Sequence, residues 1–158
     1  MGDGPRARAG RDRGGGRVAG VGAAARVTAP VVLCYSFGGG LAQELAYRAP
    51  ERVRRLVLCA TWPGLGGTPP RPMAALMLAG QLSATAGWSS LPWLHRVSEP
   101  ALVAAGEDDP SVPVRNGRVL AARLPDARLH VVKGGGHLFL LDEPESVAGV
   151  IRDFLNAP

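Results

Sequence analysis

The feature that most constrains the fold of this chain is a pair of short apolar runs separated by a glycine cluster and a segment with helical spacing. The first run spans residues 27–35 and the second spans Val53–Ala60. Runs of this length without polar alternation are typical of strands buried on both faces, as in parallel sheets. Between them, the spacing predicts a helix over residues 41–49, which Pro50 ends. The order strand, turn, helix, strand predicts one βαβ unit.

The same alternation continues toward the C-terminal end. Strands are predicted at Ala101–Ala105 and Arg128–Val132, with a helix at Gly117–Arg123 between them. Residues 61–92 are rich in Pro, Gly, Ser and Thr, and we expect a loop with one helix there. The whole pattern predicts an α/β fold with a mostly parallel sheet and flanking helices.

Two of the expected helices can be described in more detail. For the helix over residues 41–49, the predicted sheet-facing residues are Leu41, Leu45 and Ala46, and the predicted polar residues are Gln43, Glu44 and Arg48. The last helix is expected to have Asp142 as its N-cap and Glu145 at its third position, and to end near Leu155.

Positive charge is concentrated at the N-terminal end. The net charge is +5 over 158 residues, and residues 1–26 carry +4 of it, from six arginines against two aspartates. Because this segment has no apolar periodicity, we expect a disordered tail ahead of one folded domain at residues 27–158. Arginine with glycine is also typical of nucleic-acid-binding arms. The composition favours the plain tail, and we expect no nucleic-acid partner.

Several other classes are disfavoured by what the sequence lacks. Cys34 and Cys59 each lie inside an apolar run, which predicts buried free thiols. Neither a signal-peptide-like start nor a run of about 18 apolar residues occurs, so we expect a cytoplasmic protein without a transmembrane segment. Zinc-like Cys/His spacing and a complete dinucleotide fingerprint are also absent, so we expect no metal and no cofactor.

The pentapeptide Cys34-Tyr35-Ser36-Phe37-Gly38 joins the first strand to the helix. A nucleophilic serine needs such a turn, which exposes its hydroxyl at the carboxyl edge of the sheet. The amide of Phe37 is then a candidate oxyanion donor. Cys34 stands where the usual G-x-S-x-G pattern has glycine, so we expect a tighter turn. The alternative for the pentapeptide alone is an ordinary strand-to-helix turn with a capping serine.

Three acidic residues follow the next predicted strand: Glu107, Asp108 and Asp109. A triad acid lies on such a loop, where it can accept a hydrogen bond from an imidazole. A run of this kind is also typical of a solvated acidic turn. We choose Asp109 as the acid because Pro110 and Pro113 fix the backbone around it.

His137 follows three glycines after the last predicted strand. A flexible loop lets a general base approach a serine, and histidine titrates near neutrality. His95 is expected to be a packing or surface residue, and His130 a core or edge histidine. Ser36, Asp109 and His137 each follow a predicted strand, in the order nucleophile, acid, base.

The chain resembles the α/β-hydrolase superfamily, and more narrowly the intracellular poly(3-hydroxyalkanoate) depolymerases of the medium-chain-length type. The resemblance lies in VVLCYSFGGGLAQELAYRAPERVRRLVLCATWPG, AGWSSLPWLHRVSEPALVAAGEDDPSVPVRNGRVLAARLPDARLHVV and GGGHLFLL, which cover most of residues 31–155. The block from Gly87 to His95 is the most specific part. The resemblance implies Ser36 as nucleophile, Asp109 as acid and His137 as base. It also implies an aliphatic hydroxyalkanoate polyester or a related acyl ester as substrate.

Two features depart from that family. Its N-terminal strands include an HG-type loop that supplies a second oxyanion donor, and no His-Gly pair occurs before Ser36. Its helical cap is longer than the stretch at about 64–92, so we expect only a reduced cap. Loss of one oxyanion donor costs about 10²–10³ in rate. We therefore expect a partial α/β-hydrolase fold that acts as a serine ester hydrolase, with a catalytically inactive remnant or binding fragment as the alternative.

Overall fold

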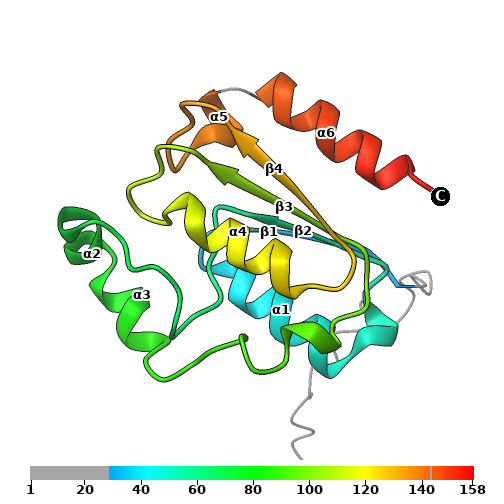
Figure 1. The fold of residues 1–158 in the computed structure, drawn as a ribbon, viewed down its shortest axis with the longest axis horizontal. Coiled ribbons are helices and arrows are strands. Elements are labelled where there is room, and N and C mark those ends of the chain that lie inside the picture. Colours follow the sequence, from blue (N-terminus) through cyan, green and yellow to red (C-terminus); the bar gives the residue numbers. More distant parts are fainter. Residues whose placement is uncertain (1–28, 143) are drawn as a thin grey trace, which may run out of the picture.

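Four parallel strands form the centre of the structure, a computed structural model that describes residues 29–142 and 144–158. The strands are β1 (Val31–Tyr35), β2 (Arg55–Cys59), β3 (Ala101–Gly106) and β4 (Ala127–Val132). They lie side by side in chain order, each parallel to the next (Figure 1). The predicted α/β fold with a mostly parallel sheet is confirmed. The tail expected at residues 1–26 lies outside the described residues.

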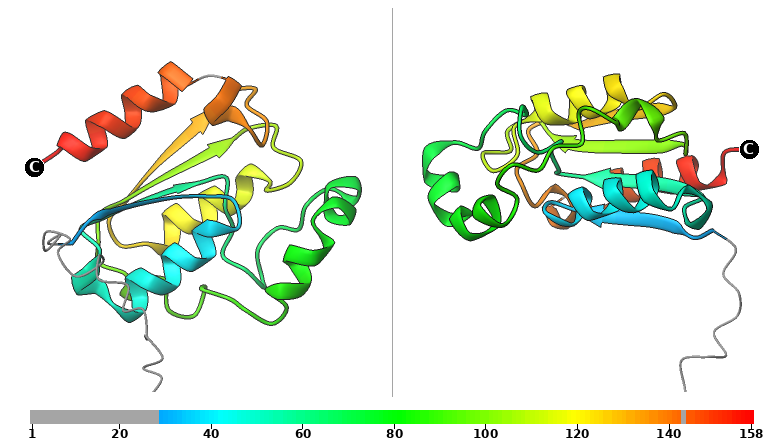
Figure 2. Two further views of the ribbon diagram at one scale, coloured as in Figure 1. Left: turned by 180° about the vertical axis from the view of Figure 1, so that it is seen from behind. Right: turned by 90° about the horizontal axis from the view of Figure 1, so that it is seen from below.

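Helices cover both faces of this sheet (Figures 1 and 2). The helices of the described residues are α1 (Gly38–Arg48), α2 (Pro72–Met77), α3 (Ala79–Ala84), α4 (Val114–Arg123), α5 (Phe139–Asp142) and α6 (Pro144–Asn156), with 3-10 turns at Pro50–Arg52 and Leu94–Arg96. Of these, α1 and α4 cover one face and α5 and α6 cover the other. Successive residues of β2 alternate between the two cores. Leu56 and Leu58 pack with α1 and α4, whereas Val57 and Cys59 pack with α5 and α6. This alternation explains why the four residues that follow Arg55 in this strand are all apolar.

Helix α1 buries a different face from the one predicted. Leu41 is 66% exposed and Leu45 is 37% exposed, whereas Gln43 is fully buried. The helix contacts the sheet through small residues, among them Ala42 and Ala46, so it lies too close to the strands to admit a leucine there. The prediction was therefore wrong for Leu41, Leu45 and Gln43 and correct for Ala46.

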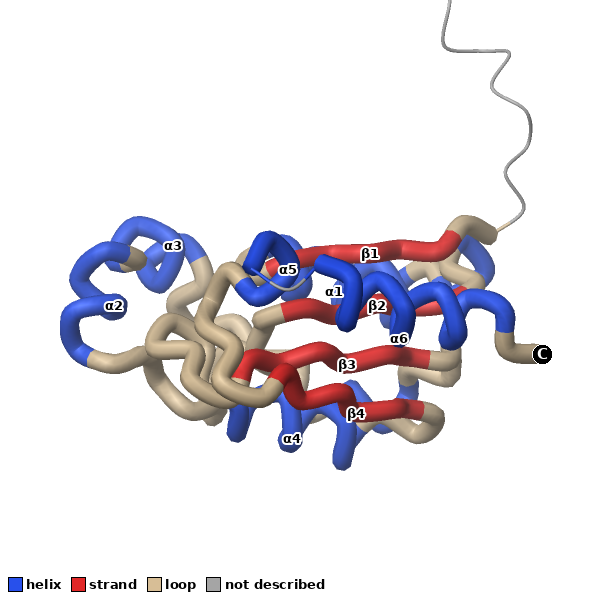
Figure 3. The backbone as a smooth tube through the Cα atoms, turned by 90° about the horizontal axis from the view of Figure 1, so that it is seen from above, coloured by secondary structure: helices blue, strands red, loops and turns tan. Residues whose placement is uncertain are grey.

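Along the chain, β2 and β3 are connected by a segment that contains two short helices, α2 and α3, where the sequence predicted one. The helix breaks at Leu78, which has φ −97° and ψ 8°. Figure 3 shows both helices beyond the carboxyl ends of the strands. An isolated antiparallel β-bridge between Gly64 and Ser89 joins the two ends of the segment that contains α2 and α3. The pair therefore lies at the edge of the sheet where α/β proteins bind ligands.

The start of the last helix also differs from the prediction. Asp142 is the last residue of α5, and its amide donates to the carbonyl of Leu138. Glu145 is the second residue of α6, which ends at Asn156. The expected N-cap is therefore wrong, because the residues that follow His137 form a short helix of their own.

Both cysteines are free thiols, as predicted, but the predicted burial is correct only for Cys59. Cys59 is buried among α5, α6 and the sheet, and Cys34 is half-buried on the opposite face of the sheet. Burial raises the pKa of both thiols, that of Cys59 to about 12. No helix within the described part of the chain is long and apolar enough to span a membrane.

Candidate active site

Ser36 occupies a strained turn between β1 and α1. Its φ of +51° lies in the left-handed region, which a residue other than glycine adopts at a cost of about 1 kcal/mol or more. The turn is held from both sides. The amide of Ser36 donates to the carbonyl of Cys59 at 2.8 Å, and the carbonyl of Ser36 accepts from the amide of Gly39 at 3.0 Å. The side chain therefore lies at the carboxyl edge of the sheet.

At this turn the backbone of α1 packs against neighbouring residues more tightly at Gly39 than at Gly38. A Cβ added to Gly38 would lie 3.8 Å from the Cβ of Cys34, which is ordinary contact. A Cβ added to Gly39 would lie 2.6 Å from Cγ2 of Thr61 and closer still to its Oγ1. Cysteine is thus accommodated where the usual pattern has its first glycine. The need for glycine at position 39 comes from the loop after β2, which sequence spacing alone does not indicate.

Asp109 is the only one of the three acidic candidates that reaches His137. Its side chain is buried, and its Oδ1 accepts from the amides of Ser111 and Val112, both at 2.8 Å. Its Oδ2 lies 2.7 Å from Nδ1 of His137. The other two candidates are exposed. Glu107 instead accepts from the amide of Gly134 at 3.1 Å. This exposed hydrogen bond links the loop after β3 to the loop after β4.

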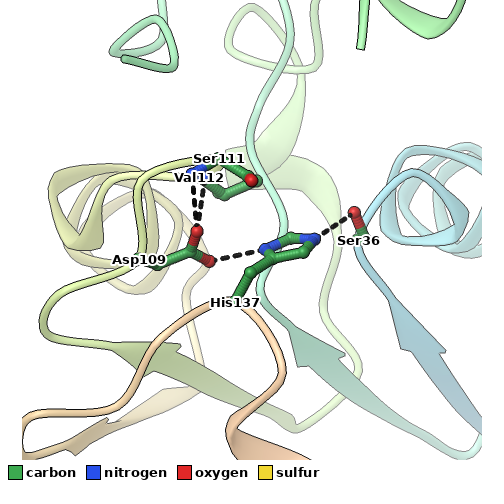
Figure 4. A network of polar contacts seen from close by, with 5 residues as sticks. All are labelled: Ser36, Asp109, Ser111, Val112 and His137. Carbon is green, nitrogen blue, oxygen red and sulfur yellow. Dashed lines mark hydrogen bonds and ion pairs between the residues drawn. The ribbon is translucent and has the colours of Figure 1, made fainter. Parts of the chain in front are cut away.

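His137 lies between the other two side chains. Its Nε2 is 3.0 Å from Oγ of Ser36, and Figure 4 shows the contact continuing through the ring to Asp109. The glycine loop brings it there by packing closely on β3. A Cβ on Gly106 would overlap the carbonyl oxygens of Gly135 and Gly136. The other two histidines lie elsewhere: His95 is exposed in the 3-10 turn Leu94–Arg96, and His130 lies on the edge strand β4.

The hydrogen-bond pattern assigns each ring nitrogen a role. A buried carboxylate only accepts, so Nδ1 carries a proton and donates it to Asp109. Nε2 is then free to accept from the hydroxyl of Ser36. The ring of Tyr35 lies beside the imidazole, with centroids 5.5 Å apart. Such an arrangement can withdraw a proton from the serine and return it to a leaving group.

The amide of Phe37 lies next to the serine at the N-terminus of α1. Within the described residues no acceptor is found for this amide, whereas the carbonyl of Phe37 accepts from Gly40. An unpaired amide at a helix N-terminus is suited to an oxyanion. Among the described residues there is also no group of three His, Cys, Asp or Glu side chains that could hold a metal ion.

An apolar cavity of about 310 Å³ lies between α2, α3 and the loop that follows β3. Trp62, Leu78 and Leu82 contribute to its wall, and so do Ser111 and Val112. The last two residues are the ones whose amides bind Asp109. The cavity therefore borders the loop that holds Asp109, although Ser36 and His137 are not among its lining residues. Its size and lining are typical of small-molecule sites.

The chain is similar in sequence to hydrolases of the α/β-hydrolase fold. The profile of the α/β-hydrolase fold family matches residues 71–144. Poly(3-hydroxyalkanoate) depolymerase of Ectopseudomonas oleovorans is 35% identical over 170 aligned residues, which cover 78% of this chain and 60% of that protein. Esterase YbfF of Escherichia coli is 38% identical over 71 residues, covering 44% of this chain and 26% of the esterase.

Solved structures share the same fold. A hydrolase from Pseudomonas aeruginosa superposes with a TM-score of 0.70 and 26% identity, covering 83% of this chain and 66% of the other. A 2-hydroxy-6-oxo-6-phenylhexa-2,4-dienoate hydrolase from Rhodococcus superposes with a TM-score of 0.71 and 16% identity, over 83% of this chain and 65% of the other. The chain thus spans roughly two thirds of the length of each of these structures.

Proposed function

We propose that this chain, which belongs to the α/β-hydrolase family, is a serine-dependent hydrolase of carboxylic esters. One observation carries the proposal. Hydrogen bonds run without a gap from Oγ of Ser36 through both ring nitrogens of His137 to the buried carboxylate of Asp109. These residues come from three separate loops, so their alignment is not a product of local sequence.

In this proposal Oγ of Ser36 attacks the ester carbonyl while Nε2 of His137 takes its proton. The amide of Phe37 binds the negatively charged oxygen that forms. The alcohol leaves with the proton from His137, and an acyl group remains on Ser36. Water then attacks the acyl group, His137 again takes and returns a proton, and the acid is released. Asp109 keeps the imidazole oriented and stabilises its charged form throughout.

The substrate class we propose is an aliphatic hydroxyalkanoate ester, either a polyester or its oligomers. Two observations support it: the 35% identity with a poly(3-hydroxyalkanoate) depolymerase, and the apolar cavity that borders the loop holding Asp109. We take residues 64–92 as a reduced cap that forms one wall of this cavity. An apolar wall of that kind suits an alkyl side group better than a charged one.

Hydrolysis of a short-chain p-nitrophenyl ester by the purified chain tests the chemistry. We expect Ser36→Ala to lower kcat/KM by about 10⁴-fold or more, because the nucleophile is removed. Ser98→Ala removes an exposed hydroxyl outside the site and serves as the matched control. Equal rates for the unchanged chain and Ser36→Ala would reject the catalytic proposal. That result would favour the alternative, an inactive hydrolase remnant or binding fragment.

The substrate class needs a separate comparison. We expect oligomers of 3-hydroxyoctanoate to be cleaved with a higher kcat/KM than oligomers of 3-hydroxybutyrate, because the longer side group can enter the apolar cavity. A preference for the shorter oligomer would reject the medium-chain substrate while leaving the serine chemistry intact.

A further inference from the structure

Two segments meet over the apolar cavity. We call residues 64–71, which lead into α2, the cap-entry segment, and residues 109–116, which include the first three residues of α4, the acid loop. Both contribute to the wall of the same cavity of about 310 Å³. Their separation therefore fixes the width of the cavity at this point.

Three hydrogen bonds fasten the cap-entry segment to the acid loop. The amide of Arg71 donates to the carbonyl of Pro110 at 2.8 Å. The amide of Thr68 donates to Oδ1 of Asn116 at 2.7 Å, and Nδ2 of Asn116 donates to the carbonyl of Thr68 at 2.8 Å. One side chain thus binds both polar groups of one backbone residue. Of the natural side chains, only those of asparagine and glutamine carry an amide that offers such a donor and acceptor together.

This contact is buried and closely packed. Asn116 is 1% exposed and lies in the wall of the cavity. A Cβ added to Gly67 would lie 2.8 Å from Oδ1 of Asn116 and 3.0 Å from the carbonyl oxygen of Gly64. The cap-entry segment therefore passes so close to Asn116 that position 67 has no room for a side chain.

The same loop holds the acid. Oδ1 of Asp109 binds the amides of Ser111 and Val112, and the amide of Asn116 donates to the carbonyl of Pro113 at 2.8 Å. The acid loop is thus a compact turn with Asp109 at one end and Asn116 at the other. A change in the position of Asn116 would alter the cavity wall without touching the reacting atoms.

On the basis of the proposed ester hydrolysis, we propose that Asn116 is a positioning residue that sets selectivity for the length of the acyl chain. Its amide holds the cap-entry segment at a fixed distance from the acid loop, and so keeps the cavity at the width of an extended alkyl chain. Loss of either hydrogen bond lets the segment shift and water enter, which weakens binding of long chains more than of short ones.

The test compares kcat/KM for p-nitrophenyl decanoate with kcat/KM for p-nitrophenyl acetate. We expect Asn116→Leu and Asn116→Asp to lower the decanoate-to-acetate ratio by about tenfold, since two buried hydrogen bonds are lost or opposed. Gly67→Ala should lower the ratio in the same direction, because its methyl group displaces Asn116. Asn156→Asp makes the same chemical change at the exposed end of α6 and should leave the ratio unchanged.

The pH dependence of Asn116→Asp separates a specific role from general damage. A protonated aspartic acid can again accept from the amide of Thr68 and donate to its carbonyl. The ratio should therefore be low at about pH 8 and recover at about pH 5.5, because burial raises the pKa of such a carboxyl. The cavity wall carries no charged residue. The charged groups nearest in sequence to the lining residues are Arg71, Arg115 and Arg118, all exposed, and Asp109, which binds His137. Any loss of base function at low pH affects both esters equally and cancels in the ratio.

Binding of 11-bromoundecanol gives a readout that does not need catalysis. Its bromine should quench Trp62, the one tryptophan among the cavity residues described, and Trp62→Phe removes that signal. Quenching should persist in Ser36→Ala, and Asn116→Asp should weaken it at about pH 8 but not at about pH 5.5. Quenching without ester hydrolysis would reject the proposed function and leave the role of Asn116 standing. An unchanged ratio in Asn116→Asp, or a ratio that stays low at every pH, would overturn that role.

Discussion

Oδ2 of Asp109 lies 2.7 Å from Nδ1 of His137, while Oδ1 of the same carboxylate is already bound by two backbone amides. The carboxylate therefore cannot rotate to present its other oxygen without breaking both of those bonds. Because these amides belong to Ser111 and Val112, the backbone of the acid loop fixes the orientation of the imidazole. The relation between Asp109 and His137 is set before any substrate binds.

Asp109→Asn tests this relation. The new amide must direct its oxygen toward the two backbone amides, so its NH₂ group faces Nδ1 of His137. That arrangement selects the tautomer in which Nε2 carries the proton and cannot accept one from Ser36. We expect a loss of about 10⁴-fold in kcat with little change in unfolding free energy. Asp108→Asn, at an exposed neighbour, is the control, and comparable losses in the two variants would contradict the assignment.

Gly39→Ala tests the packing beneath the serine turn. The added methyl would overlap the side chain of Thr61, so α1 must move away from the loop after β2. We expect a loss of about 1–3 kcal/mol in unfolding free energy, measured by urea titration. Gly149→Ala in α6 is the matched control, because nothing lies within 4 Å of its added Cβ. That control should be neutral or stabilise the chain by up to about 1 kcal/mol.

Gln43→Leu tests the buried amide that sequence patterning placed on the wrong face. Its Nε2 donates to the carbonyls of Gly39 and Trp62, at 3.0 and 3.2 Å, and its Oε1 accepts from the hydroxyl of Ser90 at 2.6 Å. Leucine leaves those groups without this partner in a buried site. We expect a loss of about 2–4 kcal/mol in unfolding free energy. Gln81→Leu changes an exposed glutamine of α3 and should shift stability by less than about 0.5 kcal/mol.

The order of strands and helices, and the edge of the sheet where the candidate site lies, could be predicted from the sequence. Strand and helix order followed from apolar runs, and parallel strands then required their carboxyl-end loops to meet at one edge. That topology explains why side chains predicted from separate loops, those of Ser36, Asp109 and His137, lie together in the structure. Their catalytic roles stay predictions until the variants above are measured.

Other features depend on contacts between segments far apart in the chain, which local patterns do not contain. Gln43 is buried because Trp62 and Ser90 offer it partners. Asn116 carried no signal in the sequence, since its partner Thr68 lies 48 residues away. Helix periodicity ranks residues by polarity alone, so it favours a leucine over a glutamine at a buried position even where the neighbouring backbone supplies hydrogen bonds.

Tyr35 supplies a prediction about stability and pH. Its hydroxyl is buried without a hydrogen-bond partner in the described structure. Burial, and then the negative charge of Asp109, raise the pKa of Tyr35 to about 12. Removing an unpaired buried hydroxyl should not cost a hydrogen bond. We therefore expect Tyr35→Phe to raise the unfolding free energy at neutral pH by up to about 1 kcal/mol.

The dependence of the unfolding free energy on pH in the alkaline range distinguishes the raised pKa of Tyr35 from a general effect of the substitution on packing. The unfolded chain loses the tyrosine proton near its usual pKa of about 10, before the folded chain does. The part of the unfolding free energy that comes from the raised pKa of Tyr35 is therefore complete below about pH 10 and is lost as pH rises toward 12. Urea titrations should show a shallower decline above about pH 10 in Tyr35→Phe than in the unchanged chain, since Cys59 titrates alike in both. Tyr47→Phe, which loses a hydroxyl bonded to Arg96, should not stabilise the chain at neutral pH. Equal alkaline slopes for Tyr35→Phe and the unchanged chain would mean that the phenol ionises as freely in the folded protein as in the unfolded one.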